Sequence, residues 1–164
     1  EGPTKEVVLH AIELAQQQGT LISLDLADPG LIRRNNDFLK DLVLTKADIV
    51  FLNETEAKEF TGLEPEEAVV EIGKQVKIAV VKIGKEGSLV SSEGVVTYIP
   101  GYPAKAIDTT GAGDTFAAGF LYGYCQDWDL EKSGKLGSLM AARIVVQKGV
   151  KVNELDVVGL KKSV

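Results

Sequence analysis

The sequence predicts an α/β fold, in which helices cover a mostly parallel sheet, and three observations favour this class. Helical patterns alternate with short apolar runs over the first half of the chain. These runs are continuously apolar, as expected for strands that are buried on both faces. A glycine-rich turn in the second half joins an apolar segment to a further helical pattern. Because 164 residues are enough for one domain with its own core, we expect a single α/β domain over residues 1–164.

The first half of the chain carries most of this alternation. Apolar residues at helical spacing, followed by Gly19, predict a first helix. Asp28-Pro29-Gly30 predicts a turn after the first strand, and Gly62 predicts the end of a later helix. The predicted helices span residues 3–18, 36–46, 53–60 and 65–74, and the predicted strands span residues 20–26, 48–52 and 77–83.

The second half begins with a predicted antiparallel hairpin, whose strands at 88–92 and 95–99 flank Glu93-Gly94. An apolar strand ending at Asp108, a glycine turn and a helix follow. A last long helix is predicted to run to about Lys148 from a cap at Asp127 or Asp129, and Gly149 is its natural stop. Residues 152–164 show no clear pattern.

The glycine turn reads Asp-Thr-Thr-Gly-Ala-Gly-Asp from Asp108 to Asp114. Gly111 and Gly113 allow a sharp turn and a close approach to a ligand, and Thr109 or Thr110 can cap the helix. The unpaired N–H groups of a first helical turn form an anion site, most often for phosphate. The carboxylate of Asp114 at that point would repel a phosphate that only had to be bound. This residue is better explained as a base that takes a proton from an attacking hydroxyl. The alternative is that the acidic residue only favours the helix start.

Two other strand ends carry polar or glycine-rich sequences. Asn53 and Glu56 follow a buried strand at the spacing of a capping box, and they could also face a metal ion at the same rim of the sheet. Gly84 and Gly87 follow the next strand, either as a simple turn or as a loop that approaches a nucleotide. Lys82 precedes them, where it would meet phosphate as a point charge or remain solvated.

Three motifs, which lie at Asn53/Glu56, Gly84/Gly87 and Asp108–Asp114, together resemble the ribokinase/PfkB family of sugar and nucleoside kinases. DTTGAGDTFAAGF is similar to the C-terminal signature of that family, and VVKIGKEG resembles its ATP-contacting loop, with Lys82 where many members carry threonine. The adenosine-kinase-like branch is the most similar. The resemblance implies that Asp114 is the catalytic base and that the backbone of Gly111, Ala112 and Gly113 forms the anion hole. It also implies a ribokinase-like α/β/α sandwich with a small antiparallel hairpin.

The resemblance further implies the cofactors. The Asn53/Glu56 motif corresponds to the family motif linked to Mg²⁺ and phosphate, so Glu56 would hold Mg²⁺ through water. Gly84 and Gly87 would contact ATP. Asp108 and Thr110 lie where relatives place a monovalent cation, which makes K⁺ a further candidate ligand.

The implied function is transfer of the γ-phosphate of ATP to a hydroxymethyl group of a sugar or nucleoside. Family members are about twice as long, and nothing here matches their N-terminal sugar motif or their lid. We therefore expect the C-terminal, nucleotide-binding portion of a kinase, with little turnover by itself. The alternative is a non-catalytic nucleotide-binding module. The acceptor is not predicted, and a homodimer remains open.

Composition excludes several other classes. The net charge of −6 argues against non-specific nucleic-acid binding. One cysteine excludes an internal disulfide and fits a cytoplasmic protein. No apolar run is long enough to cross a bilayer, so we expect no membrane partner.

Overall fold

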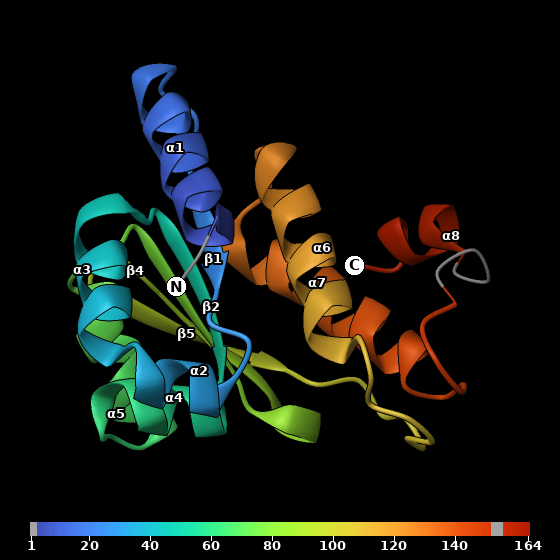
Figure 1. Ribbon diagram of the computed structural model, residues 1–164. Coiled ribbons are helices and arrows are strands. Elements are labelled where there is room, and N and C mark those ends of the chain that lie inside the picture. Colours follow the sequence, from blue (N-terminus) through green and yellow to red (C-terminus); the bar gives the residue numbers. More distant parts are fainter. Residues whose placement is uncertain (1–2, 152–155) are drawn as a thin grey trace. The chain divides into compact units, whose positions relative to one another are not determined.

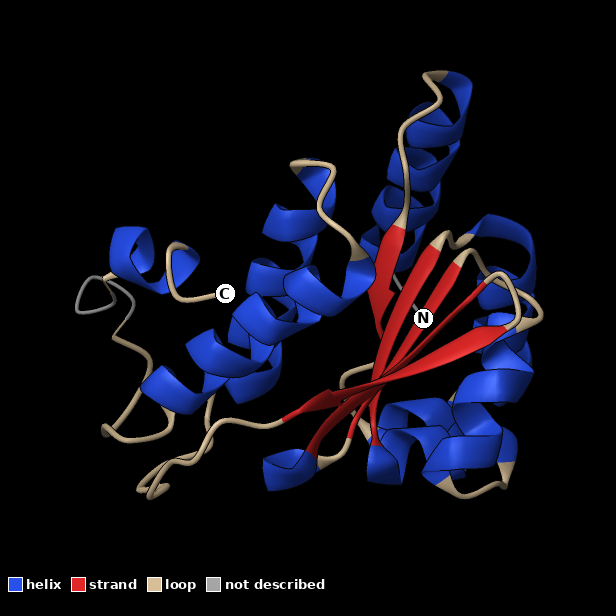
Figure 2. Cartoon of the chain, turned by 180° about the vertical axis from the view of Figure 1, so that it is seen from behind, coloured by secondary structure: helices blue, strands red, loops and turns tan. Residues whose placement is uncertain are grey.

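A computed structural model describes residues 3–151 and 156–164. The predicted α/β class is confirmed, since the described residues form helices together with a mixed sheet of five strands in the order β1-β2-β3-β4-β5 (Figures 1 and 2). The strands are β1 (Ser23–Asp25), β2 (Ile49–Asn53), β3 (Ile78–Lys82), β4 (Gly87–Ser92) and β5 (Val95–Pro100). The helices are α1 (Pro3–Gln17), α2 (Pro29–Arg34), α3 (Asn36–Lys46), α4 (Glu54–Thr61), α5 (Pro65–Gly73), α6 (Ala112–Cys125), α7 (Leu130–Ile144) and α8 (Val157–Lys161), with a 3₁₀ turn η1 (Gly84–Glu86).

The sheet combines both pairing directions. β1 and β2 are parallel, with Leu24 opposite Val50. β4 and β5 form the predicted hairpin, in which Glu93 and Gly94 have φ values of 52° and 77°. Two successive positive φ values are typical of the tight turn whose twist matches antiparallel strands.

The chain divides into two compact units, which we describe separately. The first contains the residues up to Val80 together with Ser91–Val95, and the second contains Val81–Val90 together with the residues from Val96 onward. The expectation of one domain over residues 1–164 therefore stays a prediction.

The first unit has its own apolar core. Ile12 of α1, Ile22 and Leu42 of α3 are buried together, and Phe38 packs against them. The Ile22 N–H donates to Oδ2 of Asp48 at 2.8 Å, which ties the segment before β1 to the start of β2.

The second unit is built around α6 and α7, which lie side by side (Figures 1 and 2). Glycines let the two backbones approach closely: a Cβ on Gly119 would lie 2.9 Å from the Cα of Gly137. On α7, the side chains of Leu136, Leu139 and Met140 form a cluster with Leu160 of α8. The helix α6 that follows the glycine turn is thus held by direct backbone contact with α7.

Several local expectations are wrong. The segment before Asp108 is not a strand; the N–H groups of Ile107 and Asp108 instead donate to the carbonyl of Val145, the residue after α7. Neither Thr109 nor Thr110 caps α6, because Gly111 occupies the cap position without a side-chain bond.

The other differences concern element boundaries. Asp28 does not merely begin a turn but caps α2, where Pro29 fits the first helical position. The helix α7 begins at the predicted Asp129 cap but ends at Ile144, before Lys148. Of the segment without a clear pattern, residues 152–155 lie outside the described residues, and α8 occupies part of the remainder.

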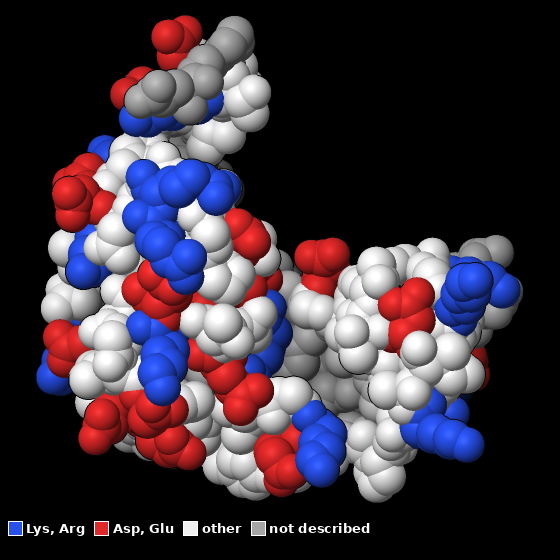
Figure 3. All heavy atoms as spheres, turned by 60° about the horizontal axis from the view of Figure 1, so that its bottom comes forward, with Lys and Arg blue, Asp and Glu red and all other residues white. Residues whose placement is uncertain are grey.

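Charged residues show no large area of one sign on the face drawn in Figure 3, where acidic and basic side chains alternate. Within the described residues, no helix combines the length and the apolar character that a bilayer-spanning segment needs.

Candidate functional site

The glycine turn in the second unit leads directly into α6. Gly111 adopts φ of 76°, a left-handed conformation that suits glycine, and its carbonyl accepts bonds from the N–H and the hydroxyl of Thr115 at 2.9 and 2.7 Å. The Ala112 N–H donates to the Thr109 carbonyl at 3.1 Å. In the described part of the chain, no protein acceptor binds the N–H groups of Gly113 and Asp114. The first turn of α6 therefore presents two backbone donors, together with the positive end of the helix dipole.

Lys82 adds a full positive charge at this turn. It is the last residue of β3, and its Nζ lies 3.1 Å from the position that a Cβ on Gly113 would occupy. A side chain on Gly113 would therefore crowd the ammonium group. Because the backbone donors and the ammonium lie together, the turn is suited to bind an anion.

The side chain of Asp114 is exposed in the first turn of α6. A carboxylate turned into the protein interior could not take a proton from a bound substrate. The exposed position therefore agrees with the predicted role as a base. The alternative, that Asp114 only stabilises the start of the helix, also agrees with an exposed carboxylate at this position.

Asp108 lies at the beginning of the turn. Its Oδ1 accepts the Thr110 N–H at 2.9 Å, and its Oδ2 accepts the Gly149 N–H at 2.9 Å. Hydrogen bonds from the hydroxyl and N–H of Thr110, and then from the Gly149 N–H, lower the pKa of Asp108 from 3.8 to about 2. The carboxylate is therefore ionised at neutral pH and already bonded to backbone donors.

Gly84 and Gly87 have different structural settings. Gly84, with φ of 56°, is exposed at the start of η1. Gly87, with φ of 120°, is buried, and a Cβ there would collide with the Ile99 carbonyl and lie 2.6 Å from the Gly101 nitrogen. Backbone packing is thus sufficient to require glycine at position 87, while Gly84 is open to a ligand.

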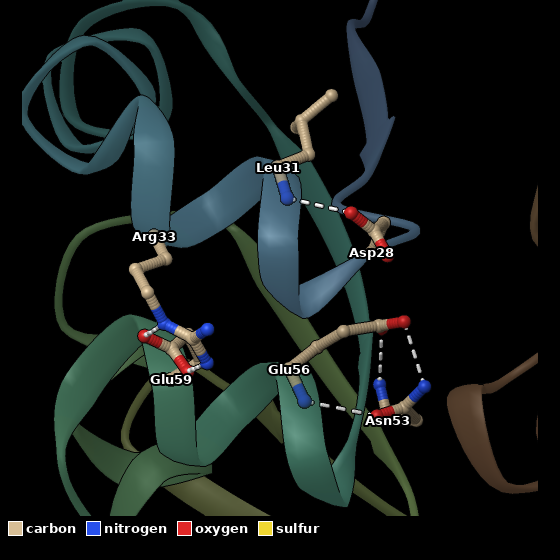
Figure 4. Close-up of polar contacts among 6 residues, drawn as sticks. All are labelled: Asp28, Leu31, Arg33, Asn53, Glu56 and Glu59. Atoms are coloured by element: carbon tan, nitrogen blue, oxygen red, sulfur yellow. Dashed lines mark hydrogen bonds and ion pairs between the residues drawn. The ribbon is translucent and has the colours of Figure 1, made fainter.

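Asn53 and Glu56 form the predicted capping box in the first unit (Figure 4). The Glu56 N–H donates to Oδ1 of Asn53 at 2.9 Å, and the Glu56 carboxylate accepts the Asn53 N–H at 2.7 Å and its side-chain amide at 2.6 Å. The Glu56 side chain is buried, with 3 % relative exposure. The capping interpretation is confirmed, and the magnesium role stays a prediction.

Within the second unit, the structure brings together seven predicted positions: Lys82, Asp108, Thr110, Gly111, Ala112, Gly113 and Asp114. It also adds Val145, Gly149 and Val150, which sequence reasoning did not connect with the turn. Val150 lies over Gly111, since a Cβ on that glycine would be 2.5 Å from Cγ2 of Val150. The only sequence signal for this segment is Gly149, which local rules explain as a helix stop.

Comparisons with known proteins identify the family. The model of the pfkB family of carbohydrate kinases matches residues 3–156, and the chain belongs to this family. Ribokinase from Haemophilus influenzae is 33% identical over 156 residues, which cover 91% of this chain and 48% of that protein. A 5-dehydro-2-deoxygluconokinase from Clostridium botulinum is 29% identical over 88% of this chain and 46% of its own length.

Solved structures agree with this assignment. A probable sugar kinase from Rhizobium etli superposes with a TM-score of 0.93 at 34% identity, over 99% of this chain and 50% of that one. Adenosine kinase from Sinorhizobium meliloti gives a TM-score of 0.90 at 29% identity, over 97% of this chain and 49% of that one. The chain spans about half the length of the relatives that it matches.

Proposed function

We propose that this chain is the nucleotide-binding part of an ATP-dependent kinase that phosphorylates a hydroxymethyl group of a sugar or nucleoside. One observation carries the proposal: the Lys82 ammonium and the free N–H groups of the first turn of α6 lie together, next to the exposed carboxylate of Asp114. This combination suits a phosphate that must be bound beside a base.

In this proposal each group has a separate task. The free N–H groups of Gly113 and Asp114 and the Lys82 ammonium stabilise negative charge on the transferred phosphoryl group. The Ala112 N–H, which was expected to belong to the anion hole, instead donates to the Thr109 carbonyl. Asp114 accepts the proton of the acceptor hydroxyl as its oxygen bonds to the γ-phosphorus. The bond between that phosphorus and the β–γ bridging oxygen breaks, and its electron pair leaves with ADP.

The remaining predicted residues serve binding. Asn53 positions the carboxylate of Glu56, whose oxygens suit Mg²⁺, and Glu56 would hold this ion through water. Bound Mg²⁺ would neutralise charge on the nucleotide phosphates. Gly84 offers exposed backbone to the nucleotide, and K⁺ near Asp108 and Thr110 remains a proposal.

The relatives guide the choice of acceptors to be tested. A nucleoside kinase from Burkholderia thailandensis, 26% identical, was solved with inosine. A fructokinase from Vibrio cholerae, also 26% identical, was solved with fructose, ADP and calcium. Ribose, fructose, adenosine and inosine are therefore the first candidates for this chain's parent protein.

The test is a coupled assay on the complete protein with ATP, Mg²⁺ and these acceptors. We expect Asp114→Asn to lower kcat by about 10²- to 10⁴-fold, because it removes the general base but keeps the shape of the side chain. The contrasting variant Lys82→Met should mainly raise the KM for ATP, by about ten-fold, because it removes a charge from the phosphate site.

Two outcomes would contradict the proposal. If turnover of Asp114→Asn stays within a few-fold of the wild-type value, the base assignment is wrong. If calorimetry shows that the wild-type protein binds ATP with Mg²⁺ but no acceptor is phosphorylated, a non-catalytic nucleotide-binding module is the correct function.

A further inference from the structure

One carboxylate in the second unit joins two segments that are far apart in the chain. Asp108 accepts the Thr110 N–H within the glycine turn, and it accepts the Gly149 N–H, 41 residues further on, at 2.9 Å. Since both bonds end on the same side chain, Asp108 fixes the segment after α7 to the turn.

Further contacts strengthen the same connection. The N–H groups of Ile107 and Asp108 both donate to the carbonyl of Val145, at 2.7 and 3.2 Å. The methyl groups of Val150 fill the space above Gly111. The residues from 145 to 150, called here the covering segment, thus contact the turn through hydrogen bonds at Val145 and Gly149 and through apolar packing at Val150.

We propose that Asp108 is a positioning residue: it holds the covering segment against the glycine turn and thereby fixes the direction of the N–H groups at the start of α6. The inference rests on the proposed function, because that direction matters only when the turn binds a phosphate. Asp108 acts through the turn and does not bind the phosphate itself, since its negative charge would repel it.

The expected benefit is preorganisation. A turn built on a glycine with φ of 76° can adopt many conformations once its neighbours release it. Donors that are already fixed lose little conformational entropy when the anion binds, so the affinity for ATP is higher.

The test compares Asp108→Asn with Asp129→Asn in the complete protein. Asparagine at position 108 keeps one acceptor oxygen but cannot satisfy both N–H groups. The control residue Asp129 makes the same type of bond, to the Lys132 N–H at 2.7 Å, at the start of α7 and away from the turn.

For Asp108→Asn we expect hydrogen exchange of the peptide containing Gly149 to become about ten-fold faster without any ligand. We expect the KM for ATP to rise about ten-fold, with kcat changed less than about three-fold. Asp129→Asn should change neither quantity, because Asp129 lies at the start of α7, at the opposite end of this helix from Gly149.

A second variant removes only the apolar contact. Val150 has 47% relative exposure, so Val150→Ala should leave the thermal stability nearly unchanged. It should nevertheless raise the KM for ATP in the same direction, and it carries the test if Asp108→Asn does not fold.

Two outcomes would overturn the inference. The first is unchanged exchange at Gly149 in Asp108→Asn, and the second is an unchanged KM for ATP in both variants. If the wild-type protein phosphorylates no acceptor, the proposed function fails, whereas Gly149 exchange and the calorimetric Kd for ATP still test the positioning role.

Discussion

Replacing Gly137 by alanine tests whether α6 and α7 need glycine at their contact. A Cβ at this position would lie 2.7 Å from the carbonyl oxygen of Phe116 and 3.2 Å from Cδ2 of its ring. The carbonyl belongs to the α6 backbone and cannot move unless the helix moves. Overpacking of this kind costs about 1–3 kcal/mol, while alanine recovers up to about 1 kcal/mol of helix propensity.

A matched substitution separates these two contributions. Gly30→Ala in α2 also gains helix propensity, but its Cβ would meet side-chain atoms and no backbone: a guanidinium nitrogen of Arg34 and the Oδ1 of Asp28 that caps α2, both at 3.1 Å. We therefore expect Gly137→Ala to be about 2 kcal/mol less stable than Gly30→Ala, measured as the free energy of unfolding in urea. Since α6 begins at the glycine turn, the KM for ATP should rise as well.

The result that would refute this reasoning is specific. If the two variants differ by less than about 0.5 kcal/mol, the helices can separate at little cost, and close backbone contact is not what positions α6. A stability loss without any change in the KM for ATP would show that the glycine turn tolerates a shift of its helix.

Two further predictions concern a buried hydroxyl and a carboxyl group. The hydroxyl of Ser88 is buried without a hydrogen-bond partner among the described residues, so Ser88→Ala should raise the free energy of unfolding by about 1 kcal/mol. The contrasting variant Ser133→Ala removes a 2.8 Å hydrogen bond to the Asp129 carbonyl, so it should lower the free energy of unfolding by about 1 kcal/mol in the same urea titration. The pKa of Asp108 is lowered to about 2 in the folded protein, so its stabilising contribution is complete above about pH 4 and is lost as the pH falls toward 2. A carbon-13 NMR titration of that carboxyl with a midpoint near 3.8, the unperturbed value, would contradict this.

Local features of the fold were predictable from the sequence. The capping box of Asn53 and Glu56 and the cap at Asp129 involve residues three positions apart, so their hydrogen bonds follow from spacing alone. The hairpin turn at Glu93-Gly94 is equally local. The error before Asp108 has a physical cause: an apolar segment can be paired with a helix end instead of a strand, and only the tertiary fold determines which.

The sequence by itself determined the α/β class, the family resemblance and the residue types of the phosphate turn, because periodicity and short motifs encode contacts within a few residues. The tertiary structure alone decided that the Lys82 ammonium lies at Gly113, that Asp108 binds Gly149, and that Val150 covers Gly111. These contacts join positions up to 41 residues apart. They depend on where β3 and α7 end and on how closely glycine lets backbones approach, and neither property can be read from local sequence.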